Sequence, residues 1–437
     1  MTVRIIGEGL DAVIFANALV RRGVAFEWLV KNNRFGGYFA GGLDCQGKPI
    51  DLGMVSLDPN HYDTPQREIN TFCGETGQSA RPFIYAAYQL LSEIAGEYEL
   101  VDTKSQNKYG ENEADYFLSD RLFAFNNHAE EIIGELEDRV SWLQSHPEWH
   151  PRFKLNQDSV LSSTNIPDAM ITLYGKSFYN LYFKDYLVNC LGELVHSVPT
   201  SLHRRAWVPL YWPETILEYL LKKGEIEPLF QPVFARFSNM SISEWIFRMI
   251  GEIESYKKKN IILLDNEPNY KNLNIESENV YAFLDLSKIH TNLNSSVQNP
   301  VISAARITIV HFCCIAPSAL VIFLRDDESG SYRFSLTPGD VPGKGKISIE
   351  YGENSADLSD EEILSRSIKL CVRNGIAIEC VGKIHKGKLP FIVPSIDSDC
   401  SILSIARNKQ TFFSSVATSF NDNIIRAAWA IDDEKRM

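Results

Sequence analysis

Short apolar runs alternate with a helical stripe at the start of the chain. Val3–Ile6 and Phe26–Val30 have the length and residue types of buried parallel strands. Between them, apolar residues recur at helical spacing from Asp11 to Arg22, and Gly23 ends the stripe. The order strand, helix, strand predicts a βαβ unit and therefore an α/β fold with a parallel sheet.

Helical periodicity dominates the middle of the chain, and two short apolar runs interrupt it. Apolar residues recur at helical spacing in three stretches and again from Ile242 onward, where Ser241 or Ser243 is the candidate N-cap. The two runs predict further buried strands. The three stretches are residues 84–95, 112–150 and 167–213, and the two runs are residues 261–264 and 280–286.

The last third of the chain carries the strongest β signal. Apolar and β-branched runs, separated by turns rich in Asp, Gly and Pro, predict an antiparallel sheet. These runs are residues 307–315, 320–324, 332–336 and 346–351, with a further strand at 389–394. Ser359, followed by three acidic residues, predicts a capped helix over 359–377, and a last amphipathic helix reaches Ile431.

Three small residues follow the first strand at the spacing of a dinucleotide-binding turn. Gly7 allows the tight turn, Gly9 lets the backbone approach a pyrophosphate, and Ala12 lets the helix pack close to the strand. The helix then points its N-terminal amides and positive dipole end at the phosphates. A turn that uses glycine for packing alone is the alternative, but the flanking strands and helix favour a nucleotide site.

Two elements after the second strand narrow the interpretation. They are Arg34-Phe35-Gly36-Gly37 and Ile50-Asp51-Leu52-Gly53. Together with the first turn, they make the chain resemble the FAD-dependent amine oxidase superfamily, which includes protoporphyrinogen oxidase, phytoene desaturase, monoamine oxidase and UDP-galactopyranose mutase. The resemblance implies FAD as the cofactor, with the paired glycines letting the backbone lie against its pyrophosphate.

The resemblance implies that residues from both ends of the chain bind FAD. It places the N-terminus of the last helix, at Asp422 and Asn423, beside the flavin ring, where the helix dipole stabilises an anionic reduced flavin. The implied cofactor-binding residues are Gly7, Gly9, Leu10, Ala12, Lys31, Asn32, Arg34, Gly36, Gly37, Asp422 and Asn423.

The end of the second strand departs from the family pattern. Where the family carries an acidic residue for the adenosine ribose, this chain has Val30, followed by Lys31 and two asparagines. Three explanations stay open. Asn32 or Asn33 binds the ribose, Lys31 marks the 2′-phosphate of NADP, or the affinity for the cofactor is reduced or lost.

The resemblance also implies a two-domain organisation. We expect an α/β fold in which a Rossmann-like FAD-binding domain is interrupted by an inserted α+β substrate domain with a helical part and an antiparallel sheet. The discontinuous FAD-binding domain would comprise residues 1–60, 228–300 and 395–437, and the substrate domain residues 61–227 and 301–394.

Candidate substrate-binding residues lie in the aromatic helical region and in the sheet. Tyr186 belongs to a tyrosine-rich stretch, and Arg204 and Arg205 stand close to two tryptophans. Guanidinium groups bind carboxylate or phosphate, although core packing and a surface arginine pair are the alternatives. The resemblance places Arg333 and Glu350 in neighbouring strands, where a buried pair would be structural and a cavity-facing pair would bind substrate. The sequence identifies no catalytic residue.

Composition and charge exclude several classes of function. A formal net charge of -13 argues against a nucleic-acid partner and against electrostatic docking to anionic membranes. The chain has no apolar run of about 18 residues or more that would predict a membrane span, and its eight cysteines show no metal-ligand spacing. The core strand starts at Val3, which leaves no room for a targeting peptide. We therefore expect a cytoplasmic protein with a small-molecule substrate, with a homodimer or a partner subunit both open.

Three functions fit these observations. The first is an FAD-dependent oxidoreductase that transfers a hydride from a small molecule or biosynthetic intermediate to flavin N5. The second is a flavin-dependent isomerase of a nucleotide sugar, similar to UDP-galactopyranose mutase, in which N5 attacks the sugar without net redox. The third is a non-catalytic scaffold subunit that kept the fold and weakened or lost the cofactor.

Overall fold

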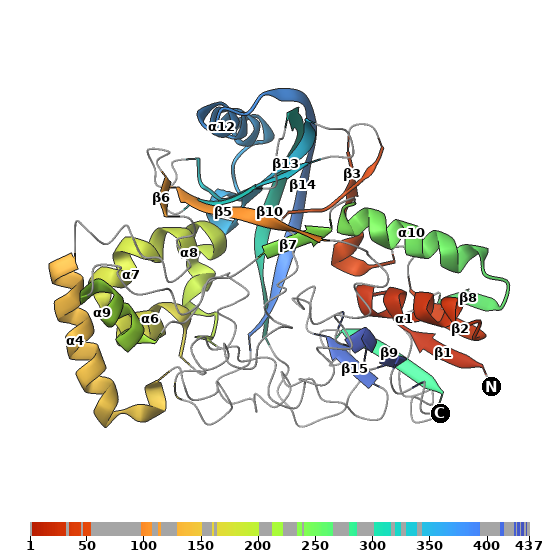
Figure 1. Cartoon of the computed structure of the whole chain (residues 1–437), viewed down its shortest axis with the longest axis horizontal. Helices are drawn as coiled ribbons and strands as arrows, with labels where there is room; N and C mark the ends of the chain where they lie inside the picture. The colour runs from red at the N-terminus through yellow and green to blue at the C-terminus, as the bar shows by residue number, and fades with distance from the viewer. Residues whose placement is uncertain are drawn as a thin grey trace.

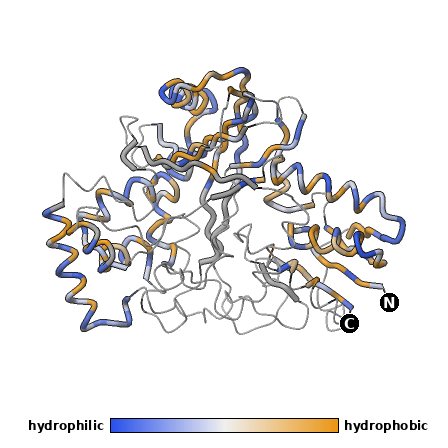
Figure 2. The backbone as a smooth tube through the Cα atoms, viewed as in Figure 1, coloured by the Kyte–Doolittle hydropathy of each residue, from blue (hydrophilic) through white to orange (hydrophobic). Residues whose placement is uncertain are grey.

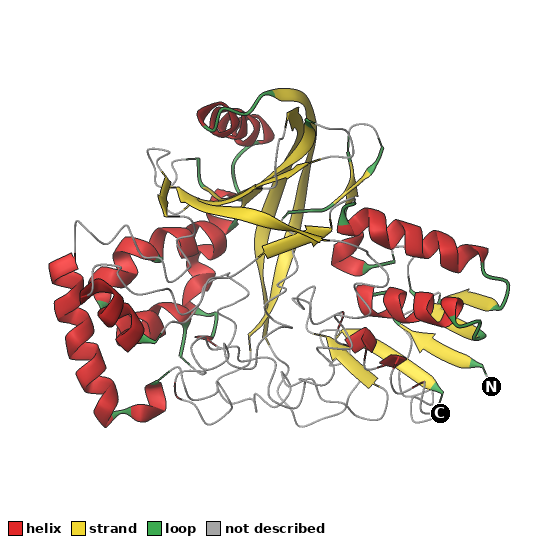
Figure 3. Ribbon diagram, in the orientation of Figure 1, coloured by secondary structure: helices red, strands yellow, loops and turns green. Residues whose placement is uncertain are grey.

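A parallel sheet, a larger mixed sheet and a group of helices make up the molecule (Figure 1). In Figure 3 one group of helices lies at the left, the parallel sheet and its own helices lie at the right, and the larger sheet stands between them. The computed structural model describes residues 2–31, 35–44, 47–53, 98–106, 112–114, 129–150, 160, 164–200, 212–221, 234–237, 240–264, 279–285, 301–315, 320–324, 329–338, 343–393, 411–414, 424, 426–428, 430, 431 and 434.

The parallel sheet has five strands, and all their pairings are parallel. Their order is β15 (Thr411–Ser414), β9 (Val280–Asp285), β1 (Val3–Ile6), β2 (Phe26–Val30) and β8 (Lys259–Leu263). The predicted strands at 3–6, 26–30, 261–264 and 280–286 are confirmed. Because β1 has β2 on one side and β9 on the other, the turn after β1 lies at the switch point where such sheets bind ligands.

Helix α1 (Leu10–Arg21) packs on this sheet, with α10 (Ile242–Ser255) beside it. The first ten residues of α1 are all buried, so the helix is a core element and not a surface one. Phe15 contacts Tyr281 of β9, with ring centroids 4.7 Å apart. Ser241 caps α10 by accepting a hydrogen bond from the Glu244 amide, as the sequence predicts.

The larger sheet is antiparallel except for one pairing. Its order is β14 (Ile378–Val393), β10 (Val301–Ile315), β13 (Lys344–Tyr351), β12 (Ser331–Pro338), β11 (Leu320–Leu324), β5 (Tyr98–Gln106) and β6 (Asn112–Ala114), and β7 (Phe234–Phe237) pairs with β5. β11 and β5 are parallel. The predicted antiparallel strands of the last third are confirmed, and β10 and β14 are longer than the sequence indicates.

Several elements differ from the sequence-based expectation. Residues 112–114 form a strand where helix was predicted, because they pair with β5. β5 itself, and β15 near the C-terminus, were not predicted. β5 is largely polar and β15 has only four residues, and both gain strand structure by pairing with neighbouring strands. The predicted helix at 84–95 lies outside the described residues.

The helical part packs tyrosine and phenylalanine side chains into one core with the sheet. Its helices are α4 (Ala129–Ser145), α6 (Ile166–Tyr174), α7 (Lys176–Tyr182), α8 (Lys184–Leu191) and α9 (Pro213–Leu221), with 3₁₀ turns η5 (Pro147–Trp149) and η6 (Gly192–His196). Asn165 caps α6 through the Asp168 amide. Figure 2 shows blue and orange residues alternating along α4, as expected for a helix with one buried face.

The two faces of the larger sheet have different neighbours. Ile309 and Tyr332 join the core of the helical part, whereas Val310, Phe334 and Ile349 form a core under α12 (Asp360–Arg373). A capping box at Ser359 starts α12, which confirms the predicted N-terminus.

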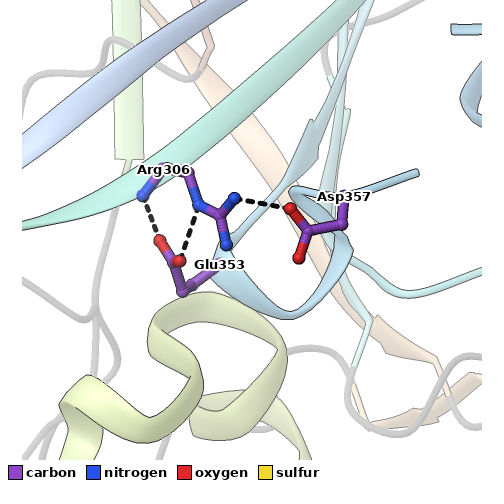
Figure 4. Close-up of polar contacts among 3 residues, drawn as sticks. All are labelled: Arg306, Glu353 and Asp357. Atoms are coloured by element: carbon purple, nitrogen blue, oxygen red, sulfur yellow. Dashed lines mark hydrogen bonds and ion pairs between the residues drawn. The ribbon is translucent and has the colours of Figure 1, made fainter. Parts of the chain in front are cut away.

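An exposed arginine joins β10 to the turn η9 (Glu353–Ser355) that follows β13. The Arg306 side chain donates to Glu353 at 2.7 Å and to Asp357 at 2.6 Å, and its backbone amide also donates to Glu353 (Figure 4). These hydrogen bonds raise the pKa of Arg306, so the three charges stay paired at the surface.

Candidate functional site

The turn after β1 can be made by glycine alone. Gly7 has φ +116°, and a Cβ placed on it would lie 2.2 Å from the Phe283 carbonyl oxygen of β9. Trp28 of β2 donates its indole N–H to the Gly7 carbonyl at 2.7 Å. The turn therefore contacts both neighbouring strands, β2 through the Trp28 hydrogen bond and β9 through the Phe283 backbone.

A second glycine turn lies directly against the first. Gly9 forms a parallel bridge with Gly36, whose amide donates to the Glu8 carbonyl at 2.8 Å. Gly36 and Gly37 have positive φ, +88° and +59°, and start the 3₁₀ turn η1 (Gly37–Ala40). A Cβ placed on Gly37 would lie 3.8 Å from the Gly9 Cα. The predicted cofactor glycines therefore meet, and they present backbone without side chains.

Helix α1 begins immediately after this contact. Gly9 is its N-cap and supplies no side-chain hydrogen bond, so the positive end of the helix dipole faces the glycine turns. Leu10 and Ala12 are fully buried, and Ala12 fills the position where a small residue lets helix and strand pack closely.

A buried ion pair occupies the same helix end. One carboxylate oxygen of Asp11, Oδ1, accepts from the Ala12 amide at 3.0 Å, and the other, Oδ2, accepts from Arg426 Nε at 2.7 Å. The side chains are 3% and 2% exposed. Oδ1 lies 2.5 Å from where a Cβ on Gly9 would stand. The sequence interpretation missed this pair, although an acidic residue inside the fingerprint was a visible signal.

The end of β2 carries no carboxylate. Val30 is buried, and its carbonyl accepts from the Leu264 amide at 2.8 Å, which ties it to the segment after β8. Lys31 follows and is exposed. The described residues thus leave the three explanations for this departure open, because Asn32 and Asn33 lie outside them.

Asp51 links the segment after the second glycine turn to α10. Its carboxylate accepts from the amides of Ile242 and Ser243, at 3.1 and 2.7 Å, and from the Ser243 hydroxyl at 2.7 Å. Burial raises the pKa of Asp51, and the hydrogen bonds from Ser243 oppose that rise. Gly41 packs against Ser243 so closely that a Cβ there would lie 2.0 Å from its hydroxyl.

The segment from Gly41 to Gly53 lies on the larger sheet. It includes the short strands β3 (Gly42–Leu43) and β4 (Pro49–Ile50). Lys346 of β13 pairs with Asp44 at 3.2 Å, and a Cβ on Gly42 would lie 3.0 Å from the His385 ring of β14. The segment therefore joins the glycine turns to the face of the sheet.

Two predicted substrate residues meet on that face. Arg333 donates to Glu350 at 2.7 and 2.5 Å, and both side chains are buried. Tyr332 also donates to Glu350 and stands edge-on to Tyr186 of α8, with ring centroids 6.1 Å apart. Desolvation lowers the pKa of Arg333, but the Glu350 carboxylate outweighs it and raises that pKa. This geometry favours the structural interpretation of the pair, and a substrate contact stays a prediction.

Several predicted site residues lie outside the described part of the chain. They are Asn32, Arg34, Arg204, Arg205, Asp422 and Asn423. Their roles stay predictions. Within the described ranges, no three His, Cys, Asp or Glu side chains gather as metal ligands, and no helix is both long and apolar enough for a membrane span.

The residues around the turn after β1 have one feature that favours binding of a dinucleotide and one that disfavours it. The bare backbone of Gly9, Gly36 and Gly37 and the N-terminus of α1 form a cradle for phosphates. Among the described side chains, Asp11 brings a negative charge into this cradle, and Arg426 neutralises it.

Comparison with solved structures shows likeness over the whole chain. Reduced UDP-galactopyranose mutase matches with a TM-score of 0.62 at 12% identity, over 100% of this chain and 94% of that one. Putrescine oxidase bound to putrescine matches with 0.55 at 12% identity, over 100% and 99%. Cyclohexylamine oxidase from Brevibacterium oxydans matches equally, with 0.55 at 12% identity over 100% and 99%. No protein-family model and no curated protein matches the sequence.

Proposed function

Because the chain has the fold of FAD-dependent amine oxidase-like flavoproteins, we propose that it is an FAD-dependent oxidoreductase acting on a small molecule. The contact between the two glycine turns carries the proposal. Gly9 and Gly36 pair through their backbones, and Gly37 stands over Gly9. The positive φ of Gly37, +59°, disfavours any side chain there, and the two glycines leave bare backbone on the surface where a phosphate would lie.

The chain's own residues supply binding and position. The α1 N-terminus and the backbone at Gly37 would hold the pyrophosphate. Asp51 fixes the segment 41–53 to α10, so that this segment reaches the sheet at a defined position. FAD, when bound, supplies the hydride acceptor.

The substrate would lie on the sheet side of the segment 41–53. Tyr186 and Tyr332 are buried against each other on that side, and the charge of Arg333 is already matched by Glu350. A face with paired charges and aromatic rings suits an uncharged or aromatic part of a small molecule better than a free carboxylate. Arg204 and Arg205 remain the proposed contacts for an anionic part.

The first experiment is the visible absorption spectrum of the purified full-length protein, followed by denaturation and identification of the released cofactor. Oxidised flavin bands with FAD released in equimolar amount support the proposal. A folded, colourless protein that takes up no added FAD overturns it. With FAD bound, turnover that consumes an electron acceptor indicates an oxidoreductase, and turnover that needs reduced flavin but consumes no acceptor indicates the isomerase.

A non-catalytic scaffold is the second candidate. Two observations favour it: β2 ends in Val30 and Lys31 instead of an acidic residue, and Asp11 places a carboxylate at the phosphate cradle. In this candidate both features would weaken dinucleotide binding without disturbing the fold. The colourless outcome of the spectrum is the result that this candidate requires.

A further inference from the structure

We propose that Cys313 and Cys380 form a reversible disulfide, which makes one end of the larger sheet an oxidation site of this protein. The inference goes beyond the proposed function and does not depend on it, because it concerns two thiols and not the cofactor. The strand register and the exposure of the two cysteines carry it.

The two cysteines stand directly opposite each other in the antiparallel ladder of β10 and β14. Opposite residues of such a ladder point their side chains to the same face, and their Cα atoms lie about 4.5 or 5.5 Å apart. Both separations fall within the range that a disulfide spans, about 4.4–6.8 Å. The paired strands therefore already hold the two residues at the backbone separation that the bond requires.

A bond at this position would be reversible and not a permanent staple. Cβ atoms that face each other in a ladder are about 4.5–5.5 Å apart, whereas a disulfide prefers about 3.8 Å, so the bond must draw the two strands closer. The ladder is irregular directly after this pair, between Cys313 and Cys314, which makes a local shift of β10 easier. Strained or exposed disulfides are the ones that small thiols reduce.

The surroundings of the pair admit a small oxidant. Both cysteines are half-buried, and β14 is the edge strand of the larger sheet among the strands that the structure describes. Lys346 of β13 lies opposite Cys313 on its other side and brings an ammonium group to the same face, where it pairs with Asp44. Cysteines that react lie in partly exposed surroundings next to cations, and this pair meets both conditions.

The other described cysteines are protected by burial. Cys190, Cys314 and Cys371 are buried, and burial raises the pKa of each thiol to about 12. Such a thiol holds almost no thiolate at neutral pH, and the thiolate is the species that attacks a disulfide. Cys314 follows Cys313 directly but points to the opposite face, into the core under α12. Oxidation should therefore select one of two adjacent cysteines.

The oxidant is a low-molecular-weight disulfide such as oxidised glutathione. The thiolate of one cysteine attacks a sulfur of that disulfide, which forms a mixed disulfide and releases one small thiol. The thiolate of the other cysteine then attacks the protein sulfur of the mixed disulfide and releases the second small thiol. The two protein thiols lose two protons and two electrons, and the small disulfide takes them up to become two thiols.

The test incubates the folded full-length protein with oxidised glutathione, blocks the remaining thiols with iodoacetamide and maps the tryptic peptides by mass spectrometry. We expect one linked pair that joins residues 307–325 to residues 374–383 through Cys313 and Cys380. A link through any other cysteine, glutathione left on both residues without a link, or two residues that carry only the iodoacetamide label overturns the inference.

Matched variants decide between the two adjacent cysteines. Cys313→Ser and Cys380→Ser should each abolish the linked pair. Cys314→Ala should keep it, and this variant leaves a single thiol in residues 307–325, so the bond is assigned without ambiguity. A linked pair that survives in Cys313→Ser places the bond on Cys314 and overturns the inference.

Reversibility is measured on the native chain, which needs no variant to fold. The protein is equilibrated with mixtures of reduced and oxidised glutathione, and the linked fraction is read from the same peptides. We expect this fraction to fall from nearly complete to nearly none as the mixture shifts to the reduced form. A bond that persists in reduced glutathione alone is a permanent staple, and that result overturns the assignment of a reversible oxidation site.

Discussion

Arg333 and Glu350 face each other across neighbouring strands of the larger sheet and form a two-point ion pair. The Nε–Oε1 distance is 2.7 Å and the Nη2–Oε2 distance is 2.5 Å, with side chains 5% and 1% exposed. Tyr332 adds a third hydrogen bond to the carboxylate. Gly53 covers the pair, and a Cβ there would lie 2.9 Å from the Glu350 carboxylate carbon.

Breaking this pair on one side should destabilise the protein strongly. Glu350→Ala leaves the Arg333 charge buried without its counter-charge, and we expect a loss of about 3–5 kcal/mol in the free energy of unfolding. The double variant Arg333→Met/Glu350→Leu removes both charges and should lose much less. Urea denaturation measures both.

The exposed arginine in Figure 4, which pairs with two carboxylates, provides the control. Arg306→Met removes an exposed arginine whose partners Glu353 and Asp357 remain hydrated. The free energy of unfolding should therefore change little. If Glu350→Ala costs no more than Arg306→Met, the Arg333–Glu350 pair is not desolvated and its structural interpretation is wrong.

Gly7→Ala should cost about 3 kcal/mol or more, because the new Cβ would collide with the backbone of Phe283 at an unfavourable φ. Gly23→Ala separates the two causes. Gly23 also has a positive φ, +72°, but nothing lies within 4 Å of its Cβ position, so strain alone should cost about 1 kcal/mol. If thermal unfolding showed the same loss of unfolding free energy in both variants, the close approach of Phe283 in β9 to Gly7 would be contradicted.

The N-terminal βαβ unit was predictable because its signals are local. The turn, the stripe of α1 and the run of β2 lie within one short stretch and agree with one another. The family resemblance also implied that Gly36 and Gly37 lie at the same pyrophosphate as Gly9, although the pairing of Gly9 with Gly36 itself was not predicted. The cradle could therefore be proposed before the fold was known.

The elements and contacts that the sequence did not predict depend on residues that are distant from one another in the chain. β5 and β6 are polar, and they become strands by extending a sheet built from the last third of the chain. The pair between Asp11 and Arg426 joins residues 415 positions apart, so the acidic residue in the fingerprint was visible in the sequence but its partner was not. Asp51 likewise meets Ser243 across the interface of two elements. Such contacts decide the chemistry of the site but leave no periodicity in the sequence.

Asp51→Ala should destabilise the protein by about 2–3 kcal/mol, because it removes an acceptor from the amides of Ile242 and Ser243 and from the Ser243 hydroxyl. Ser241→Ala is the matched control, since it removes one capping bond from the same helix and should cost about 1 kcal/mol. Urea denaturation compares them. Equal costs would mean that Asp51 acts as a helix cap alone and does not hold the segment 41–53.

His311 should make the protein lose stability as the pH falls. Its side chain is 4% exposed on β10, and burial lowers its pKa to about 3, with the neighbouring His385 ring, 5.2 Å away between centroids, adding to the shift. In the unfolded chain a histidine has a pKa of about 6.5. Between these values the unfolded state binds the proton and the folded state does not, so stability falls by up to about 1.4 kcal/mol per pH unit as the pH drops below about 6.

The measurement is the free energy of unfolding in urea between pH 7.5 and 4.5, the lower part of which also includes the contribution of carboxylates. His311→Gln removes the titrating group, so its stability should fall less steeply with decreasing pH than that of the native chain. His196→Gln is the control, because it removes an exposed histidine instead of a buried one. If the stability of His311→Gln fell with pH as steeply as that of the native chain, His311 would be protonated in the folded protein as in the unfolded one. The face of the larger sheet that carries this side chain would then admit a positive charge.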